Sequence, residues 1–219
     1  MIKKLLLLLA LLYSLDVNAA TTRTAVQTDN FNDNDLTTGT VVWTQVMPGS
    51  STCVNSSGSI TFSGGPQCGL RADGTYSNDQ YAKFSIAAFS GGSGPYYGVT
   101  CRASADTDGG RDFYVFYFNE TGSGTYGDAT IALVVNDGFT TLSSVTLTWS
   151  VSDTIEIECD GTAIRGLKNG TVQTTATNAT LTTGKPGVWL YFGGQRLDNY
   201  EGGNLTAGST APVMRRMIQ

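Results

Sequence analysis

Residues 129–138, with the sequence ATIALVVNDG, combine the signals of a strand and of a tight turn. Ile131, Val134 and Val135 are β-branched residues, the type that is enriched in strands. The stretch ends in Asn136-Asp137-Gly138, and these residue types tolerate the positive φ angles of a two-residue hairpin turn. The stretch therefore predicts a strand over 129–136 that is followed by its antiparallel partner.

Similar combinations of strand and turn signals recur along the whole chain. Asn169-Gly170 is a second hairpin signal, and Gly-rich stretches separate other segments. No helix of ten or more residues is expected after the N-terminal segment. Many short strands without helices predict an all-β fold in which two antiparallel sheets pack together. The expected strands are 41–46, 59–62, 81–89, 96–103, 112–119, 129–136, 142–149, 154–159, 163–168, 171–176, 187–192 and 197–201.

The first 19 residues have the composition of a secretion signal rather than of a folded element. Lys3 and Lys4 precede the apolar run at 5–12, and Val17-Asn18-Ala19 supplies the small residues of a cleavage site. We predict cleavage after Ala19 or one residue later; the alternative is an uncleaved membrane anchor. The apolar run is shorter than the roughly 20 residues that span a bilayer. The prediction is a secreted protein without membrane contact after cleavage.

The mature chain is acidic. Removing residues 1–19 takes away two lysines and one aspartate, which leaves 11 basic and 17 acidic residues and a net charge of −6. Such a surface argues against nucleic acid as a partner, because non-specific binding needs clustered Lys and Arg. We expect one domain over 20–204 and a C-terminal tail over 205–219, which includes Arg215-Arg216 and is a candidate segment for assembly with a partner or a second copy.

Four cysteines stand behind the predicted signal: Cys53, Cys68, Cys101 and Cys159. An even count in a secreted chain favours disulfides, and none of them forms the C-x-x-C pair of zinc or redox sites. Three pairings are possible. We favour Cys53–Cys68, a local bridge across a Gly-rich stretch, which leaves Cys101–Cys159 to join two strands. The alternative for the second pair is two buried free thiols.

Several motifs, in order, resemble concanavalin A-like (laminin G-like) jelly rolls of the type found in phage and bacterial surface proteins. The resemblance covers residues 27–203 and implies two curved antiparallel sheets, with a concave face and rim loops that often bind glycans. Fold alone does not define function, and the four cysteines depart from the pattern. The motifs are Asp29-Asn30-Phe31-Asn32 with Trp43-Thr44, Asp79-Gln80-Tyr81-Ala82, Tyr97-Gly98-Val99 with Arg102-Ala103, Asp153–Glu158 with Lys168-Asn169-Gly170, Gly187-Val188-Trp189, and Leu197–Gly202.

Catalytic candidates are limited because the chain contains no histidine. Ser-His-Asp and Cys-His catalysis are therefore excluded, and carboxylates remain, the groups that glycoside hydrolysis uses. Glu156, Glu158 and Asp160 alternate along one strand, so they share one face. The Glu-x-Glu-x-Asp order resembles the E-x-D-x-E pattern of jelly-roll glucanases, with carboxylates of different length at the last two positions. The alternative is a solvated strand face balanced by Arg102 or Arg165.

A second candidate is a rim loop in which Asp106, Asp108 and Asp112 alternate with Gly and other residues. Alternating Asp residues in a Gly-rich loop can wrap oxygen ligands around Ca²⁺. The alternative is an ordinary Asp/Gly turn. Asp29, Asp33 and Asp35 offer further carboxylates for calcium, but an Asx-rich loop that enters the first strand explains them more simply. No cofactor is required by the sequence, and Ca²⁺ is the single candidate.

A third candidate is the aromatic run at 113–118, FYVFYF, in which both strand faces are bulky. One face must be core, and the other is a candidate platform for sugar rings or packs under a loop. We assign ligand binding to side chains on the predicted strand faces: Arg102, Tyr114, Phe116, Glu156, Glu158 and Trp189.

Together these features favour a non-catalytic, secreted recognition or structural module that binds a glycan or surface polymer, or that belongs to a virion or other extracellular assembly. The first alternative is a secreted glycoside hydrolase that uses Glu156, Glu158 and Asp160. The second is a self-assembling filament or coat protein, in which the tail or an edge strand joins a second copy.

Overall fold

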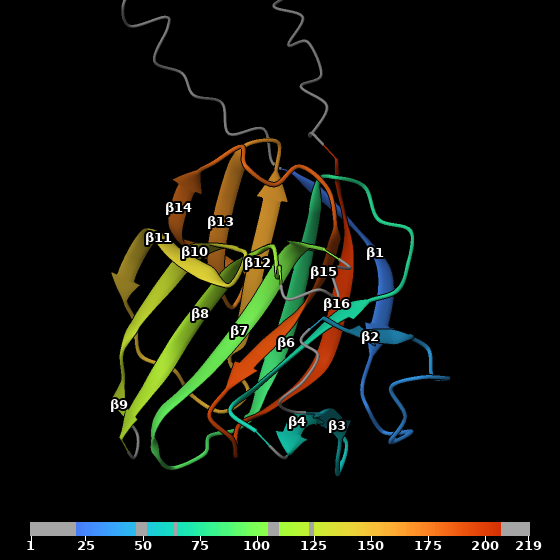
Figure 1. Cartoon of the computed structure of the whole chain (residues 1–219), viewed down its shortest axis with the longest axis vertical. Coiled ribbons are helices and arrows are strands. Elements are labelled where there is room, and N and C mark those ends of the chain that lie inside the picture. The colour runs from blue at the N-terminus through green and yellow to red at the C-terminus, as the bar shows by residue number, and fades with distance from the viewer. Residues whose placement is uncertain (1–20, 47–51, 64, 105–109, 123–124, 207–219) are drawn as a thin grey trace, which may run out of the picture. The chain divides into compact units, whose positions relative to one another are not determined.

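The computed structural model describes residues 21–46, 52–63, 65–104, 110–122 and 125–206. These residues form sixteen strands, and no helix occurs among them (Figure 1). The predicted signal segment and the tail beyond Thr206 lie outside the described residues. The strands are β1 Thr22–Asp29, β2 Trp43–Gln45, β3 Thr52–Asn55, β4 Ile60–Ser63, β5 Gln67–Ala72, β6 Gln80–Ala88, β7 Ser93–Ala103, β8 Phe113–Gly122, β9 Thr125–Tyr126, β10 Asp128–Val135, β11 Gly138–Thr146, β12 Thr154–Asp160, β13 Ala163–Lys168, β14 Thr171–Thr177, β15 Lys185–Tyr191 and β16 Arg196–Thr206.

Residues 23–205 form one compact unit built from two antiparallel sheets. Sheet A has the order β14-β13-β12-β6-β16-β4-β3, and β1 pairs with β16. Sheet B has the order β11-β10-β8-β7-β15-β5-β2, and β9 pairs with β8. Strands that are far apart in sequence, such as β7 and β15, are direct neighbours. The predicted two-sheet jelly-roll sandwich is confirmed.

Both predicted hairpin turns are present. Asn136 and Asp137 have φ angles of 48° and 66°, and they join β10 to β11. Asn169 and Gly170 have φ angles of 51° and 73°, and they join β13 to β14. All four angles lie in the left-handed region, as the type I′ turn requires. These turns set the register of two of the hairpins from local sequence alone.

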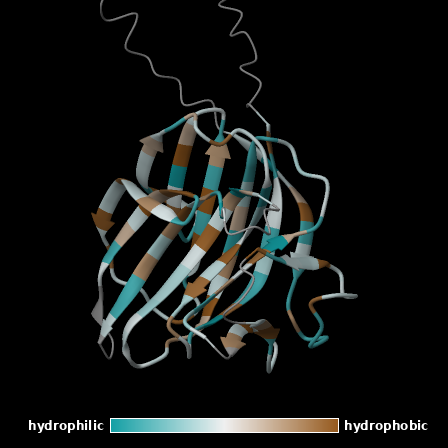
Figure 2. Cartoon of the chain, viewed as in Figure 1, coloured by the Kyte–Doolittle hydropathy of each residue, from teal (hydrophilic) through white to brown (hydrophobic). Residues whose placement is uncertain are grey.

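The core lies between the sheets, and alternating side chains from both sheets fill it. Phe84 and Ile86 of β6, Ile155 and Ile157 of β12, and Leu190 of β15 have no exposed surface. Hydrophobic and polar bands alternate along the strands (Figure 2), because successive side chains point to opposite faces of a sheet. Each sheet therefore also has an outer face, and the two outer faces lie on opposite sides of the core.

Two disulfides connect the sheets, with the pairing that the sequence analysis favoured. Cys53 of β3 is bonded to Cys68 of β5, and Cys101 of β7 is bonded to Cys159 of β12. The described residues contain no free cysteine. Since β3 and β12 belong to sheet A while β5 and β7 belong to sheet B, each bond ties one sheet to the other.

Candidate functional site

Each outer face carries a pocket. The pocket on sheet B has a volume of about 370 Å³ and is mainly aromatic. The pocket on sheet A has a volume of about 450 Å³ and is mainly polar. We call them the aromatic pocket and the polar pocket. The aromatic pocket is lined by Gln67, Tyr96, Arg111, Tyr117, Asp137, Phe139, Trp189 and Tyr191. The polar pocket is lined by Thr28, Asp29, Asn30, Thr40, Lys83, Ser85, Thr154, Asn199, Tyr200 and Glu201.

Strand register gathers the rings of the aromatic pocket. Tyr96 of β7 pairs with Tyr191 of β15, while Gly98 of β7 pairs with both Tyr117 of β8 and Trp189 of β15. Side chains of paired residues lie on the same face of a sheet. The ring centroid of Tyr96 lies 5.5 Å from that of Tyr117, 5.9 Å from that of Trp189 and 5.6 Å from that of Tyr191. Four rings from three strands thus form one continuous surface.

Gly98 makes room for the central ring. A Cβ at this position would lie 3.1 Å from Cε3 of Trp189 and 3.0 Å from Cγ2 of Val115. The indole therefore lies against the bare backbone of β7. Phe139 of β11, which is 49% exposed, extends the aromatic surface, with its ring 5.3 Å from that of Trp189. The rings reach from the middle of sheet B to its edge strand.

Polar groups are few in the aromatic pocket. Nε of Arg111 donates a hydrogen bond to the carboxylate of Asp137, and this bond lowers the pKa of Asp137. Burial and the neighbouring Tyr96 raise the pKa of Tyr117, so its hydroxyl stays protonated at neutral pH. Nε1 of Trp189 is buried and has no hydrogen-bond partner among the described residues. A buried donor without a partner carries a desolvation cost.

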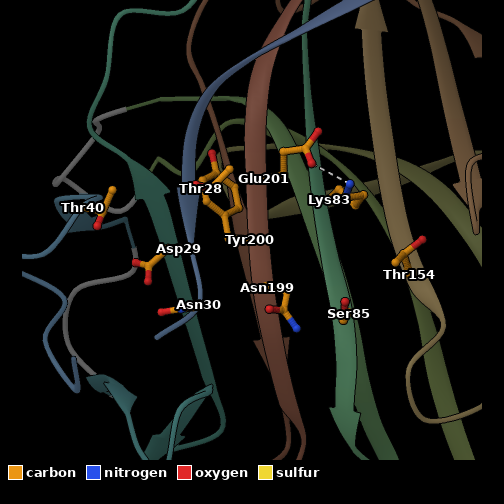
Figure 3. Close-up of a pocket in the computed structure, with 10 residues that line it drawn as sticks. All are labelled: Thr28, Asp29, Asn30, Thr40, Lys83, Ser85, Thr154, Asn199, Tyr200 and Glu201. Atoms are coloured by element: carbon orange, nitrogen blue, oxygen red, sulfur yellow. Dashed lines mark hydrogen bonds and ion pairs between the residues drawn. The ribbon is translucent and has the colours of Figure 1, made fainter. Parts of the chain in front are cut away.

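The polar pocket lies across β1, β6, β12 and β16 (Figure 3). Nζ of Lys83 lies 2.7 Å from the carboxylate of Glu201, and the two side chains point toward each other. Glu201 also accepts a hydrogen bond from the hydroxyl of Tyr81 at 2.7 Å. Burial alone would raise the pKa of Glu201, but the bonds from Lys83 and Tyr81 outweigh it and lower the pKa. The carboxylate of Glu201 is therefore ionised at neutral pH.

Asp29 forms part of the floor of the polar pocket and is fully engaged by the protein. Its Oδ1 accepts from the backbone N–H of Phe31 at 2.8 Å, and its Oδ2 accepts from Nε1 of Trp43 at 2.9 Å. Burial raises the pKa of Asp29, although both hydrogen bonds oppose the rise. The carboxylate therefore fastens the entry to β2, which is a structural role. It agrees with the simpler explanation that the sequence favoured for this acidic segment.

A β-bulge in β16 shapes the other wall of the polar pocket. Asp198 pairs with Ser85 and Glu201 pairs with Lys83, so β16 has one residue more than β6 between these pairs. Asn199 takes a φ of 51° at this point. The extra residue leaves Asp198, Asn199 and Glu201 outside the core, while Tyr200 is buried in it. Bulges commonly re-aim side chains in this way.

The three carboxylates proposed for hydrolysis share the outer face of sheet A, as predicted, but they are engaged by arginines. Glu156 lies 2.7 Å from Arg23, and Glu158 lies 2.8 Å from the same guanidinium. Arg165 lies 3.3 Å from Glu158 and 3.1 Å from Asp160. Glu156 and Glu158 are only 2% and 5% exposed, and none of the three lines either pocket. Arg165 balances this face as the alternative expected, but Glu156 and Glu158 are buried rather than solvated, and Arg23 is a partner that sequence reasoning missed.

Three residues assigned to ligand binding point away from solvent. Tyr114 and Phe116 have no exposed surface, because the alternation along β8 turns them inward and turns Tyr117 outward. Arg102 is 2% exposed and donates to the backbone carbonyls of Asn78 and Leu181. It anchors two loops and does not neutralise the β12 carboxylates. Of the assigned aromatic residues, Trp189 is the one that lines a pocket.

The predicted calcium loop falls largely outside the described residues. Asp106 and Asp108 lie within 105–109, so calcium binding there stays a prediction. Asp112 is described, and its carboxylate accepts from the backbone N–H of Asn136 at 3.0 Å. Among the described residues, no group of three or more His, Cys, Asp or Glu side chains could hold a metal ion.

No family model and no curated protein sequence matches this chain. Similar solved structures include the carbohydrate-binding module CBM66 from Bacillus subtilis, at 13% identity and TM-score 0.52, covering 75% of this chain and 93% of that one. A Bacillus subtilis protein of unknown function with a galectin-like fold matches at 7% identity and TM-score 0.58, covering 85% and 99%. A prokaryotic β-1,3-1,4-glucanase (lichenase) from a mouse hindgut metagenome matches at 11% and 0.56, covering 81% and 97%. At these identities the likeness shows the fold alone, and that fold is the concanavalin A-like jelly roll.

Proposed function

We propose that this domain is a non-catalytic recognition module that binds a glycan chain at the aromatic pocket of sheet B. One observation carries the proposal: Tyr96, Tyr117, Trp189, Tyr191 and Phe139 line a single pocket on an outer face. Apolar and aromatic walls with a few convergent polar groups are typical of ligand sites. Large aromatic clusters are seldom left on a surface without a binding role.

The chemistry of the aromatic pocket suits a sugar. A pyranose ring has apolar C–H faces that can lie on aromatic rings, and its hydroxyl groups can use hydrogen-bonding groups at the ring edges. The phenol hydroxyls of Tyr96, Tyr117 and Tyr191 can donate to a sugar hydroxyl or accept from it. Arg111 and Asp137 form an ion pair at the same pocket and can hydrogen-bond to further hydroxyl groups of the sugar.

Two further observations support recognition rather than hydrolysis. The β12 carboxylates are held in ion pairs with Arg23 and Arg165 and lie outside both pockets. A structural neighbour with a TM-score of 0.52 is a carbohydrate-binding module. The lichenase neighbour shares the fold to a similar degree, so the argument against hydrolysis rests on the residues of this chain and not on the fold.

We also infer that the domain works outside the cell. The N-terminal segment with Lys3, Lys4 and the apolar run at 5–12 supports export. Two disulfides support an oxidising compartment, because structural disulfides are rare in reducing cytosol. Amino-terminal sequencing of the protein from a secreting host tests this inference. A mature chain that begins at Ala20 or Thr21 is expected, and a retained Met1 would contradict it.

A glycan array tests the proposed function. Wild-type protein should bind at least one class of polysaccharide, and Tyr191→Ala should weaken that binding about tenfold, which corresponds to about 1.4 kcal/mol. The matched control is Val172→Ala, since Val172 is 46% exposed on β14 of the other sheet. Equal binding by Tyr191→Ala and wild type would rule out this pocket. Absence of binding by the wild type across the array would rule out the function.

A further inference from the structure

The polar pocket is separate from the aromatic pocket, and it lies on the opposite side of the sandwich. Lys83 and Ser85 alternate with the core residues Ala82, Phe84 and Ile86 along β6, so they point outward from sheet A. The aromatic pocket lies on the outer face of sheet B. A ligand in one pocket therefore cannot reach the other, because the whole core separates them.

We propose that the polar pocket is a second binding site, for a neutral, hydroxyl-rich sugar, and that one domain thereby joins two glycan chains. The second part rests on the proposed function of the aromatic pocket. The first part stands on the geometry and chemistry of the polar pocket itself.

Hydroxyl groups with unused hydrogen-bonding capacity line the polar pocket from three directions. Within the part of the chain that the structure describes, the side-chain hydroxyls of Thr28, Thr40 and Ser85 make no hydrogen bond, although all three residues line the pocket. Asn199 adds an exposed amide whose Nδ2 donates to Asp198 and whose Oδ1 remains an acceptor. These groups can both donate to and accept from sugar hydroxyls. A pocket of about 450 Å³ falls within the range of small-molecule sites.

Charge around the pocket disfavours an anion. Lys83 is the one cation among the residues that line it, and the carboxylate of Glu201 lies 2.7 Å away and offsets it. Asp29 adds a second carboxylate to the floor, and Asp198 lies beside Asn199 at the rim. A carboxylate or sulfate group would meet this excess of negative charge. A neutral sugar avoids that repulsion and can still bond to the charged pair.

The bulge in β16 gives the polar pocket its shape, because it changes which side chains of this strand face the pocket. Without the extra residue, strict alternation from Leu197 would turn Asn199 inward and Tyr200 outward. The bulge instead presents Asn199 to the pocket at a φ of 51°, a conformation that non-glycine residues rarely adopt. Tyr200 is turned into the core, where its ring lies 4.7 Å from that of Trp43.

Two sites on opposite faces give the domain a geometry for bridging. Each site engages one chain, and a polymer with repeated units can occupy many copies of the domain at once. Such multivalent contact raises the overall avidity well above the affinity of either site. We therefore expect the protein to cross-link polysaccharide in addition to binding it.

A two-step capture assay separates binding from bridging. The polysaccharide identified on the array is immobilised, the protein is bound and washed, and a fluorescent form of the same polysaccharide is then added. Protein retention measures the first contact, and fluorescence measures the second.

Two variants impair the polar pocket. Asn199→Gly removes the amide, and glycine suits the positive φ; Ser85→Tyr fills the polar pocket with a residue type that strands accept. Tyr191→Ala impairs the aromatic pocket, and Val172→Ala is the control. Light scattering establishes the oligomeric state of each variant.

We expect wild type and Val172→Ala to bridge. Asn199→Gly and Ser85→Tyr should keep their retention and lose at least tenfold of the fluorescence. Tyr191→Ala, which keeps only the polar site, should lose part of its retention and also at least tenfold of the fluorescence. Undiminished bridging in a folded Asn199→Gly would overturn the inference, and so would a wild type that is retained but does not bridge. These results would leave the proposed function intact. Retention that Tyr191→Ala leaves unchanged but Asn199→Gly abolishes would overturn the proposed function instead and keep the polar site.

Discussion

The guanidinium of Arg23 lies 2.7 Å from the carboxylate of Glu156 and 2.8 Å from that of Glu158, across 133 and 135 residues of sequence. Arg23 also lies over the ring of Tyr81, at 5.1 Å from its centroid. One side chain of β1 thus balances two nearly buried carboxylates of β12. The same contact holds both carboxylates in ion pairs and ties the first strand to sheet A.

Replacing Arg23 by Met should therefore destabilise the fold. The substitution leaves Glu156 and Glu158 buried without their shared partner, and breaking such a pair typically costs about 3 kcal/mol or more. Urea unfolding followed by circular dichroism measures the loss. The triple variant Arg23→Met, Glu156→Gln, Glu158→Gln should regain part of the stability, because no uncompensated charge remains. A single variant as stable as the wild type would show that water already solvates this cluster.

The sequence predicted the strands far better than it predicted the partners of their side chains. Twelve expected strands were found, because their alternation and their turns are local properties. The strands β1, β3, β5 and β9 were not anticipated. β1, with the sequence TRTAVQTD, is largely exposed and polar, so it gives almost no hydrophobic signal. The contact between Arg23 and Glu156 spans 133 residues of sequence, and no local pattern reports it.

The aromatic run of β8 shows a second limit. Both of its faces are bulky, so a period of two cannot tell which face is core. The packing of the two sheets decides it: Phe116 lies beside Val99 in the core, whereas Tyr117 pairs with Gly98 and lines the aromatic pocket. The sequence therefore predicted an aromatic platform but assigned it to Tyr114 and Phe116, the wrong side of the strand. The bulge at Asn199 reversed the expected alternation of β16 in a similar way.

The two disulfides should contribute unequally to stability. Cys101–Cys159 closes a loop of 58 residues and Cys53–Cys68 one of 15. In the chain-entropy model these loops correspond to about 4 and about 3 kcal/mol. We expect the Cys101→Ala, Cys159→Ala variant to lose more stability than the Cys53→Ala, Cys68→Ala variant. Urea midpoints of the two double variants, each compared with the oxidised wild type, measure the difference, and the opposite order would argue against loop closure as the main effect.

Gly98→Ala should weaken ligand binding as well as stability. The added Cβ would lie 3.0 Å from the backbone oxygen of Trp189 and 3.1 Å from its Cε3, so the indole must shift out of its place. Overpacking of this kind typically costs about 1–3 kcal/mol. Gly193→Ala is the control, because nothing lies within 4 Å of a Cβ there. Isothermal titration with the array ligand checks the prediction. Unchanged affinity in Gly98→Ala would mean that the position of Trp189 does not matter to the ligand.

Acid should remove the stabilisation that Glu201 provides. Burial raises the pKa of Glu201, but the hydrogen bonds from Lys83 and Tyr81 lower it by a larger amount. The pKa in the folded state therefore lies below its unfolded value. A lowered pKa means that this contribution is present above the unfolded value, near 4.3, and is lost as the pH falls through the folded value. Glu201→Gln should therefore cost about 1–2 kcal/mol at pH 7 and close to nothing at pH 2. Thermal unfolding of both proteins across this range measures the gap. A gap that stays constant with pH would show that the carboxylate charge is not what Lys83 and Tyr81 recognise.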